Sequence, residues 1–359
     1  MSIYIAVLFW VFISIFMNYD RSKKRKKMFV IISFFILTVI AMLRSWQVGV
    51  DTAQYYRNFG YITYLDWSQS DILRYESGFF ALCKILSYIS KDPHILIMVS
   101  SLIIIPSVGR FIYKYSENVA LSTFLYITLN TYFFHMTGMR QSLAIAFIIY
   151  GFEYLVKDKY LKYLIFVVVA SLFHSSALFL ISLIFIKKMY YYKKSYIRTI
   201  IIMGTCFVFY KYLFRVAVLI LGKYAAYEES VFGESNYFGA LFQFLIGFIL
   251  YSVCHYLYFI KKQKTLLNSK ITMIALRGFS LAVCFQALAM RMNIFGRMTS
   301  YFWIFGIIAI PNSISNLEVK RKKEWILVIA TISFLYWFII AKYRPEWHGV
   351  IPYISFFED

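Results

Sequence analysis

Charged side chains stand beside long apolar runs at several points of this 359-residue chain, and the first group combines an arginine with a carboxylate. Arg44 and Asp51 flank a glycine turn at Gly49, and Thr52 follows Asp51 directly. Charge at the edge of an apolar run is costly, so each such residue suggests a function. Gly49 permits a close backbone approach, and Asp51 can accept a proton or bind sugar hydroxyls. The alternative is that Asp51 only caps a short helix that begins at Thr52.

Two further residues can take part in proton transfer. Glu76 precedes an apolar segment, where the dipole of a helix that begins there also favours an acid. His174 lies among apolar residues, and the histidine side chain suits acid–base work or a phosphate contact. The competing interpretation of His174 is a structural hydrogen bond to Ser175 or Ser176. Asp51, Glu76 and His174 are therefore the catalytic candidates.

Four arginines are predicted to lie on the outer side of a membrane: Arg44, Arg140, Arg291 and Arg297. A guanidinium presents a fixed fork of donors that matches phosphate oxygens and keeps its charge. Gln141 adds an amide beside Arg140. Together these residues predict a site for an anionic group such as a diphosphate, whereas each arginine alone can equally be an anchor at the membrane interface.

Aromatic residues near these charges suit a sugar. Trp46, Tyr55 and Tyr56 can stack on the apolar face of a pyranose ring, and we expect Tyr55 to bind substrate. The five histidines and four cysteines show no spacing typical of metal ligands, so we expect no bound metal and no cofactor.

The composition places these residues in a membrane protein. Hydrophobic residues make up 61% of the chain and charged residues only 15%, which excludes an ordinary soluble domain. The net charge of +21 comes largely from basic clusters between apolar runs, the pattern typical of cytoplasmic loops rather than of nucleic-acid binding. We therefore expect lipid, and no nucleic acid, as a partner.

The apolar runs predict an all-α fold, a polytopic bundle of about 10–12 transmembrane helices forming one integral membrane domain over 1–359. The predicted spans are 3–17, 28–43, 95–113, 119–136, 141–156, 163–186, 199–221, 239–260, 271–290, 298–314 and 325–341, with 77–90 uncertain because it is short. Basic clusters at 21–27, 187–198, 261–264 and 320–323 predict the inner side. The sizeable loop 44–76, together with 222–238, 291–297 and the tail after 342, is then predicted to lie outside.

The segment 77–186 allows two arrangements. In the first, 77–90 only dips into the bilayer and 163–186 is a broken, re-entrant pair hinged at 174–176, which keeps the basic residues between 110 and 162 inside and Arg140 outside. In the second, both segments cross fully and Arg140 faces inward. We favour the first arrangement.

Several motifs in order along the chain resemble one family. They are Arg44…Val48-Gly49-Val50-Asp51-Thr52…Tyr55, Glu76-Ser77-Gly78, Gly138-Met139-Arg140-Gln141-Ser142-Leu143-Ala144, Phe173-His174-Ser175-Ser176-Ala177-Leu178 and Arg297…Tyr301-Phe302. The set looks like the EpsG-like branch of the Wzy-type bacterial polysaccharide polymerases, and the resemblance covers nearly the whole chain. One departure is Val50, which stands where the family usually has a threonine.

The resemblance implies a multi-pass glycosyltransferase of the bacterial cytoplasmic (inner) membrane. It would join polyprenyl-diphosphate-linked oligosaccharide repeat units on the outer face, giving a capsular polysaccharide, an exopolysaccharide or an O-antigen, with undecaprenyl diphosphate as carrier. A chain-length regulator and a flippase are the implied protein partners. Asp51 would act as base or acceptor binder with Glu76 in reserve, and the arginines would bind the diphosphate. The alternatives are a transporter or flippase of a lipid-linked saccharide, a ligase of the same chemistry, or an accessory scaffold.

Overall fold

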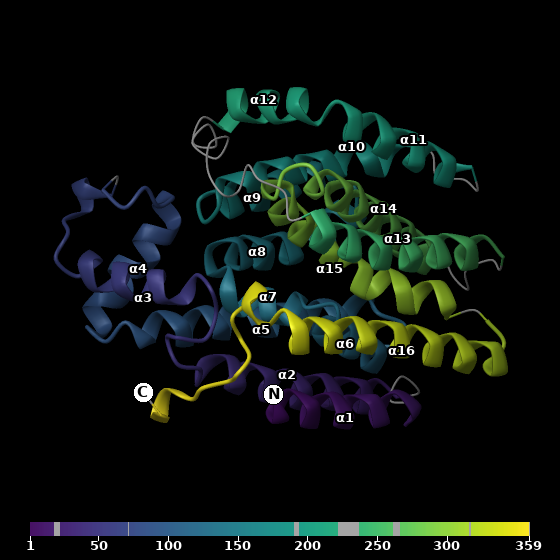
Figure 1. The fold of residues 1–359 in the computed structure, drawn as a ribbon, viewed down its shortest axis with the longest axis horizontal. Coiled ribbons are helices and arrows are strands. Elements are labelled where there is room, and N and C mark those ends of the chain that lie inside the picture. The colour runs from purple at the N-terminus through teal and green to yellow at the C-terminus, as the bar shows by residue number, and fades with distance from the viewer. Residues whose placement is uncertain are drawn as a thin grey trace. The chain divides into compact units, whose positions relative to one another are not determined.

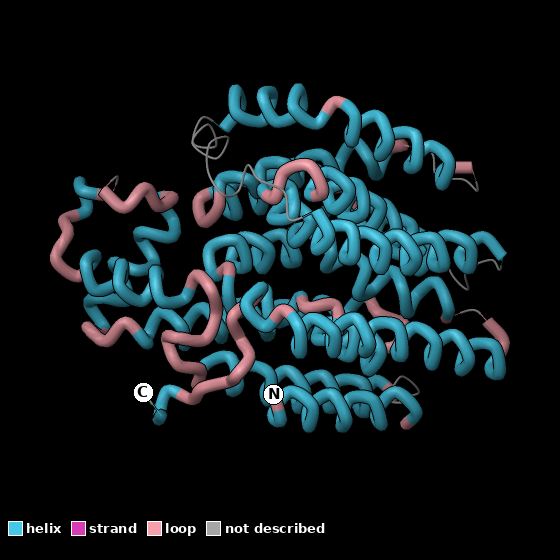
Figure 2. The backbone as a smooth tube through the Cα atoms, in the orientation of Figure 1, coloured by secondary structure: helices cyan, strands magenta, loops and turns pink. Residues whose placement is uncertain are grey.

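The computed structural model describes residues 1–17, 22–70, 72–189, 194–221, 237–260, 266–315 and 317–358, and these residues form helices and no β-strand (Figure 2). The α-helices are α1 Ser2–Phe16, α2 Lys23–Met42, α3 Thr52–Ile62, α4 Ser77–Ile89, α5 His94–Tyr115, α6 Val119–Thr128, α7 Thr131–Thr137, α8 Met139–Val156, α9 Tyr160–Ser171, α10 Ser182–Lys188, α11 Ser195–Val208, α12 Tyr210–Leu221, α13 Tyr237–Ile260, α14 Leu266–Ala289, α15 Ile294–Ile314 and α16 Val319–Tyr343. Short 3-10 helices are η2 Trp67–Gln69, η3 Ser175–Ile181, η5 Pro345–Trp347 and η6 Phe356–Glu358. The predicted fold, a polytopic helical membrane protein, is confirmed.

The helices group into two compact units. The first unit contains Met1–Phe179 and Ala330–Asp359, and the second contains Leu180–Ile329. The first unit thus holds α1 to α9 and most of α16 (Figure 1), and it carries most of the predicted site residues. That the whole chain acts as a single membrane domain stays a prediction.

Five helices in the described part of the chain are long and apolar enough to cross a membrane. They lie at His94–Tyr115, Tyr237–Phe259, Ser269–Ala289, Ile294–Ile314 and Val319–Tyr343. A sixth span forms if α11 and α12 count as one, although this pair bends by 80° within the predicted span 199–221. Four shorter apolar helices are α1, α4, α6 and α9. The number of crossings, about 10–12, stays a prediction.

Two other predicted spans are also interrupted. The segment predicted as one helix over 119–136 breaks between α6 and α7, where Asn130 takes a left-handed backbone conformation with φ 59°. Asparagine is one of the few residues that visit this conformation readily. The segment 163–186 breaks after Ser171, at Leu172–His174, next to the predicted hinge. Whether this second break makes a re-entrant pair stays a prediction.

One group of basic residues in the first unit lies around Glu153 of α8. Lys26, at the start of α2, donates to the carbonyl of Ser116, which follows α5 (2.7 Å). Beside it, Glu153 near the end of α8 pairs with Lys114 and with Lys157 (Nζ–Oε1 2.6 Å). Arg140 lies at the other end of α8, roughly 20 Å away along the helix. Arg140 and these basic residues thus lie at opposite ends of α8, and which side of the membrane each end faces stays a prediction.

The C-terminal segment folds back along the loop between α2 and α3 (Figure 1). Backbone amides of Ser45 and Gly49 donate to the carbonyls of Ile354 (2.9 Å) and Gly349 (2.7 Å). Gly49 has φ +106°, and a β-carbon there would lie 2.5 Å from the Thr52 hydroxyl. A glycine is therefore required for the turn that leads into Asp51 and α3.

The predicted outer loop 44–76 is partly helical, because α3 lies within it. The buried face of this short amphipathic helix carries Thr52, Tyr55, Phe59 and Ile62, which recur at three- and four-residue spacing. Its end is held by Lys84 of α4, whose ammonium donates to the carbonyls of Ile62 (3.3 Å) and Leu65 (2.5 Å). Lys84 therefore satisfies the carbonyl of the last residue of α3, which has no partner within the helix, and a carbonyl of the turn that follows.

We predict that the two ends of the first unit are labelled from opposite sides of the membrane. Single cysteines are introduced by Tyr61→Cys, in the exposed part of α3, and by Lys157→Cys, after α8. A membrane-impermeant maleimide should modify the first in intact cells and the second only after permeabilisation. The unmodified chain, whose cysteines 83, 254 and 284 are buried, serves as background control. Labelling of both positions from the same side would contradict the arrangement.

Candidate functional site

Four segments of the first unit meet at an ion pair between Glu76 and Arg140. Glu76 lies just before α4, and Arg140 lies in the first turn of α8. The Oε2 atom of Glu76 is 2.8 Å from Nη1 of Arg140. The Nε of Arg140 donates weakly to the hydroxyl of Tyr55 on α3 (3.5 Å). The structure therefore brings together three residues that the sequence identified separately, 21 to 85 positions apart.

The second carboxylate oxygen of Glu76 faces the break after α9. Both the backbone amide and the hydroxyl of Ser175 donate to Oε1 at 3.2 Å. The Nδ1 of His174 lies 3.5 Å from the same oxygen. His174 thus lies beside Glu76, a neighbour that the sequence did not predict. The carboxylate links Arg140 to the segment 172–175 and does not cap its own helix, since no side-chain bond from Glu76 to the start of α4 is formed.

A close contact between backbones places Glu76 at this position. The amides of Gly78 and Phe79, in the first turn of α4, donate to the carbonyl of Leu172 (2.8 and 3.2 Å). A β-carbon on residue 78 would lie 2.8 Å from both the Leu172 carbonyl oxygen and its β-carbon. The start of α4 and the break after α9 can approach this closely only because residue 78 is glycine.

Two tyrosine rings contact the guanidinium of Arg140. The Arg140 carbon Cζ lies 4.9 Å from the centre of the Tyr75 ring and 5.9 Å from that of Tyr55. Tyr75 is itself fixed by Asn58, whose amide donates to the Tyr75 hydroxyl (2.6 Å). No hydrogen bond within the described residues uses Nη2 of Arg140, and the side chain stays 21% exposed while Glu76 is 8% exposed. One edge of the guanidinium therefore remains available to a ligand.

The charges of the cluster stabilise the ionised carboxylate. Burial by itself raises the pKa of Glu76, but the neighbouring His174 and the positive charge of Arg140 outweigh burial and lower it to about 2. A carboxylate with so low a pKa binds protons weakly. Glu76 is thus better suited to orienting Arg140 than to removing a proton from a substrate.

Asp51 lies one helical turn before Tyr55. It is the N-cap residue of α3 by position, but its side chain makes no capping hydrogen bond, and its carbonyl accepts from the Tyr55 amide (3.2 Å). Residues four apart on a helix share a face, so Asp51 and Tyr55 are neighbours. Within the described residues no ion pair involves Asp51, which is half-buried.

Two predicted substrate-binding residues are buried. Arg44 is 1% exposed, and its guanidinium donates to Ala41 at the end of α2, to the Ser101 hydroxyl (3.0 Å) and to the carbonyl of Met136 (2.8 Å). It therefore binds protein acceptors from three helices and does not join the Glu76 cluster. Gln141 follows Arg140 on α8 and is 4% exposed.

The remaining two arginines belong to the second unit. Arg291 lies in the turn between α14 and α15, with its Cζ 4.3 Å from the Phe207 ring centre and 5.7 Å from that of Tyr210, at the bend between α11 and α12. Arg297 lies in the first part of α15, and the turn precedes Gly296 rather than bending at it. That these arginines serve the same ligand as Arg140 stays a prediction.

Comparison with known proteins agrees with the sequence motifs. The model of the EpsG family matches residues 27–355. The chain belongs to the EpsG family. This family comprises Wzy-like membrane proteins of the polysaccharide polymerase type. No curated protein and no solved structure matches the chain significantly.

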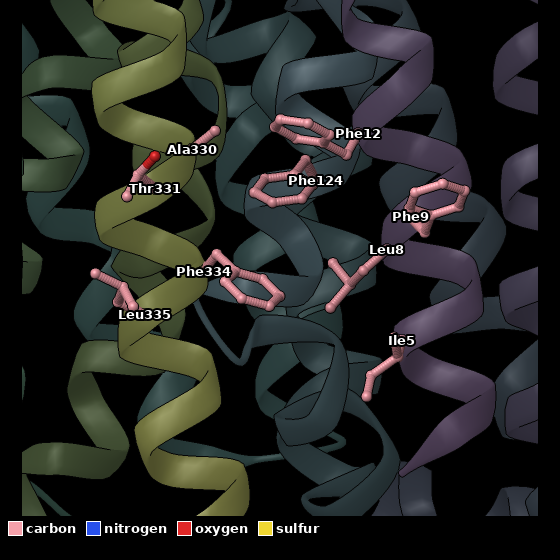
Figure 3. A pocket seen from close by; sticks show the side chains of 9 residues that line it. All are labelled: Ile5, Leu8, Phe9, Phe12, Phe124, Ala330, Thr331, Phe334 and Leu335. Carbon is pink, nitrogen blue, oxygen red and sulfur yellow. The ribbon is translucent and has the colours of Figure 1, made fainter.

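Membership of the EpsG family, together with the apolar helices, makes this a multi-pass membrane protein. An apolar hollow of about 330 Å³ lies between α1, α6 and α16 of the first unit, where Phe12, Phe124 and Phe334 line it and Thr331 is its one polar lining residue (Figure 3). Within the described residues no three histidine, cysteine, aspartate or glutamate side chains gather as metal ligands. The hollow offers no groups for chemistry. The Glu76 cluster combines a carboxylate, a guanidinium and an imidazole, and it is the candidate site of this EpsG protein.

Sequence reasoning missed the supporting residues of the cluster. Tyr75 and Asn58 were not singled out, and Ser175 was considered only as a partner of His174. A tyrosine beside Glu76 was visible in the sequence, but a cation–π contact with an arginine 65 positions away was not. Gly78 was recognised only as part of a motif, although it decides how closely two segments approach.

We predict that Gly78→Ala destabilises the protein by about 1–3 kcal/mol, because the added methyl group overlaps the backbone and side chain of Leu172. Thermal unfolding in detergent measures the effect. Gly204→Ala, in α11 where nothing lies within 4 Å of an added β-carbon, is the matched control and should be neutral or slightly stabilising. Equal unfolding temperatures for both variants would contradict the close contact.

The pKa of Glu76 predicts a pH-dependent contribution to stability. Since that pKa is lower in the folded protein than in an unfolded chain, the contribution is fully present above about pH 4.5 and is lost as the pH falls towards 2. The unfolding free energy of the native protein should exceed that of Glu76→Gln by on the order of 2–3 kcal/mol at neutral pH, with a gap that narrows in acid. Glu346→Gln, at an exposed carboxylate, is the control. A gap independent of pH would refute the assignment.

Proposed function

We propose that this EpsG protein is a polysaccharide polymerase that joins polyprenyl-diphosphate-linked oligosaccharide repeat units on the outer face of the bacterial cytoplasmic membrane. Family membership supports the reaction class, and the multi-pass fold supports a lipid-linked substrate. The observation that carries the proposal is the free edge of Arg140 beside Tyr55, at the end of α8 opposite the basic group around Glu153.

Arg140 is proposed to bind the diphosphate. Its guanidinium is oriented by Glu76 and by the Tyr75 ring, so the Nη2 donors have a fixed direction before any substrate arrives. Donors that are already oriented stabilise developing charge without reorganising during the reaction. The negative charge on the departing diphosphate is the charge they would stabilise.

The transfer itself needs an acceptor for one proton. A hydroxyl oxygen of one lipid-linked unit forms a bond to the anomeric carbon of the growing chain, while the bond from that carbon to the diphosphate oxygen breaks. The electron pair of the broken bond leaves with polyprenyl diphosphate, and the hydroxyl proton passes to a base. We assign this role to Asp51, which has no ion-pair partner among the described residues and lies one turn from Tyr55, whereas the ion pair of Glu76 lowers its basicity.

The other predicted site residues receive narrower roles. His174 is proposed to position Glu76 through its Nδ1 (3.5 Å). Arg44 is proposed to support the fold at the end of α2, because its donors already have protein acceptors. Arg291 and Arg297 remain proposed binders of anionic substrate groups.

A carrier of the same lipid-linked saccharide is the second candidate. Broken helices are common in transporters, and the 80° bend between α11 and α12 and the break after α9 are features of this kind. A ligase would use the same bond chemistry as a polymerase but a different acceptor. Product analysis distinguishes these activities.

We predict that the purified protein in liposomes converts a polyprenyl-diphosphate repeat unit into a ladder of longer products on a gel. Asp51→Asn and Arg140→Gln should each lower the rate by about 10²–10³-fold, the typical loss for a missing group that stabilises or accepts charge in the transition state. Arg110→Gln, which removes an arginine near Glu153 at the other end of α8, is the control and should keep the rate.

Two outcomes oppose the proposal. If both Asp51→Asn and Arg140→Gln give an undiminished ladder, the roles of Asp51 as base and of Arg140 as diphosphate binder are wrong. Repeat units that cross the liposome membrane but never lengthen would favour the carrier. Arg140→Lys, which keeps the charge but not the fork of donors, tests whether bidentate binding matters.

A further inference from the structure

A second hollow, lined mostly by residues with polar groups, lies on the other face of α3. Its volume is about 350 Å³, at the small end of the range for ligand pockets. The lining residues are Arg57, Gly60, Tyr61, Thr63, Tyr64 and Lys91. They belong to α3 and the turn that follows it, except for Lys91, which lies two residues after the end of α4. None of them belongs to the Glu76 cluster.

The amphipathic pattern of α3 separates the two sites. Tyr55, Phe59 and Ile62 are buried, and Tyr55 reaches Arg140 from this buried face. Arg57 and Tyr61 are exposed and share the opposite face, four residues apart. The hollow is therefore formed by the side of the helix that does not pack on the protein.

The rim of the hollow is held in place by buried polar contacts. The Lys84 ammonium, with a side chain only 6% exposed, donates to the carbonyls of Ile62 and Leu65 on either side of Thr63 and Tyr64. The Thr63 hydroxyl donates to the carbonyl of Gly60 (2.7 Å). At Gly60 a β-carbon would meet nothing within 4 Å, so the glycine leaves its part of the hollow open.

The hollow carries two positive charges that the described residues do not neutralise. Neither Arg57 nor Lys91 forms an ion pair with any described residue. The neighbouring Asp92 forms no ion pair with Lys91, and one of its carboxylate oxygens accepts from the His94 amide at the start of α5 (2.9 Å). Two cations facing an open hollow attract an anion.

Two tyrosine rings beside these cations offer flat surfaces to a ligand. Tyr61 is 63% exposed and Tyr64 is 88% exposed, far more than aromatic side chains of this size usually are. A phenol ring presents an apolar face and a hydroxyl that can donate or accept. This pairing suits a ligand with an apolar ring face and hydroxyl groups at its edge.

We propose that this hollow is a binding subsite for an anionic saccharide, such as a uronic acid or a phosphate-bearing sugar, within the glycan. Arg57 and Lys91 bind the acidic group, and Tyr61 and Tyr64 stack on the ring. A neutral sugar would leave both cations without a partner, and a plain phosphate ion would not use the rings. The inference rests on the proposed function, since it names the chemical class of the glycan that this EpsG protein handles.

The position of the subsite suits a glycan that also reaches Arg140. Tyr55 and Tyr61 are six residues apart on α3, which corresponds to roughly 9 Å along the helix axis. A saccharide bound at Tyr61 and Lys91 therefore lies near the reacting sugar but not on it. The subsite holds a neighbouring sugar residue of the chain and thereby selects acidic repeat units.

The direct test is binding of trigalacturonate to the full-length protein in phosphatidylcholine nanodiscs, measured by isothermal titration calorimetry at low ionic strength. Maltotriose is the neutral comparison. We expect trigalacturonate to bind and Arg57→Gln/Lys91→Gln to weaken its affinity about tenfold, as expected for the loss of two exposed ion pairs. Tyr61→Ala should weaken binding of trigalacturonate, and Tyr61→Phe should retain it.

The matched control is Lys320→Gln/Arg321→Gln, which removes the same two charges from exposed positions at the start of α16. It should bind trigalacturonate as the native protein does. Equal affinity of the two double variants, or equal binding of maltotriose and trigalacturonate by the native protein, would overturn the inference. If trigalacturonate binds as expected but no ladder forms from any repeat unit, the subsite stands and the polymerase proposal fails. If a ladder forms but trigalacturonate does not bind, the polymerase proposal stands and the subsite fails.

Discussion

A carboxylate removed from water must find positive charge and hydrogen-bond donors, and this requirement organises the end of the first unit that carries the site. Glu76 meets it with Arg140 on one oxygen and with Ser175 and His174 on the other. Removing Glu76 would leave the partly buried charge of Arg140 without compensation, at the cost of about 2–3 kcal/mol predicted for Glu76→Gln. The segments before α4, at the start of α8 and after α9 are thus held together by one side chain.

The segments that meet at Glu76 also provide hydrogen-bond partners for backbone groups at helix ends. The first amides of α4 have no partner within their helix, and the Leu172 carbonyl after α9 supplies one to Gly78 and Phe79. Irregular backbone inside a membrane protein is tolerated where other protein groups satisfy it. The break after α9 and the start of α4 satisfy each other, and the glycine at position 78 makes the approach possible.

The short helix α3 lies between the ion pair and the exposed surface of the first unit. Its buried face positions Tyr55 against Arg140, and its exposed face carries Arg57 and Tyr61. Lys84 secures its far end, and the pairing of Gly49 with Gly349 secures the turn before its start. An eleven-residue helix is marginal on its own, so these contacts rather than helix propensity determine its position.

The sequence by itself determined the membrane class, the helical fold, most helix positions and the residues worth testing. These follow from local patterns: apolar runs fix where helices lie, and charges beside them are rare enough to be informative. Most predicted spans end within a few residues of the observed helices, whereas the breaks at Asn130 and between α11 and α12 were not predicted.

Only the tertiary structure decided which charges meet. Glu76, a catalytic candidate that could also have been only a helix-start acid, pairs with Arg140, 64 positions later. Arg44, which was expected to bind substrate, is buried against α2, Ser101 and Met136. The reason is physical: hydrophobicity acts on each segment separately, but the partner of a buried charge is whatever group the packing of distant helices brings within about 3 Å.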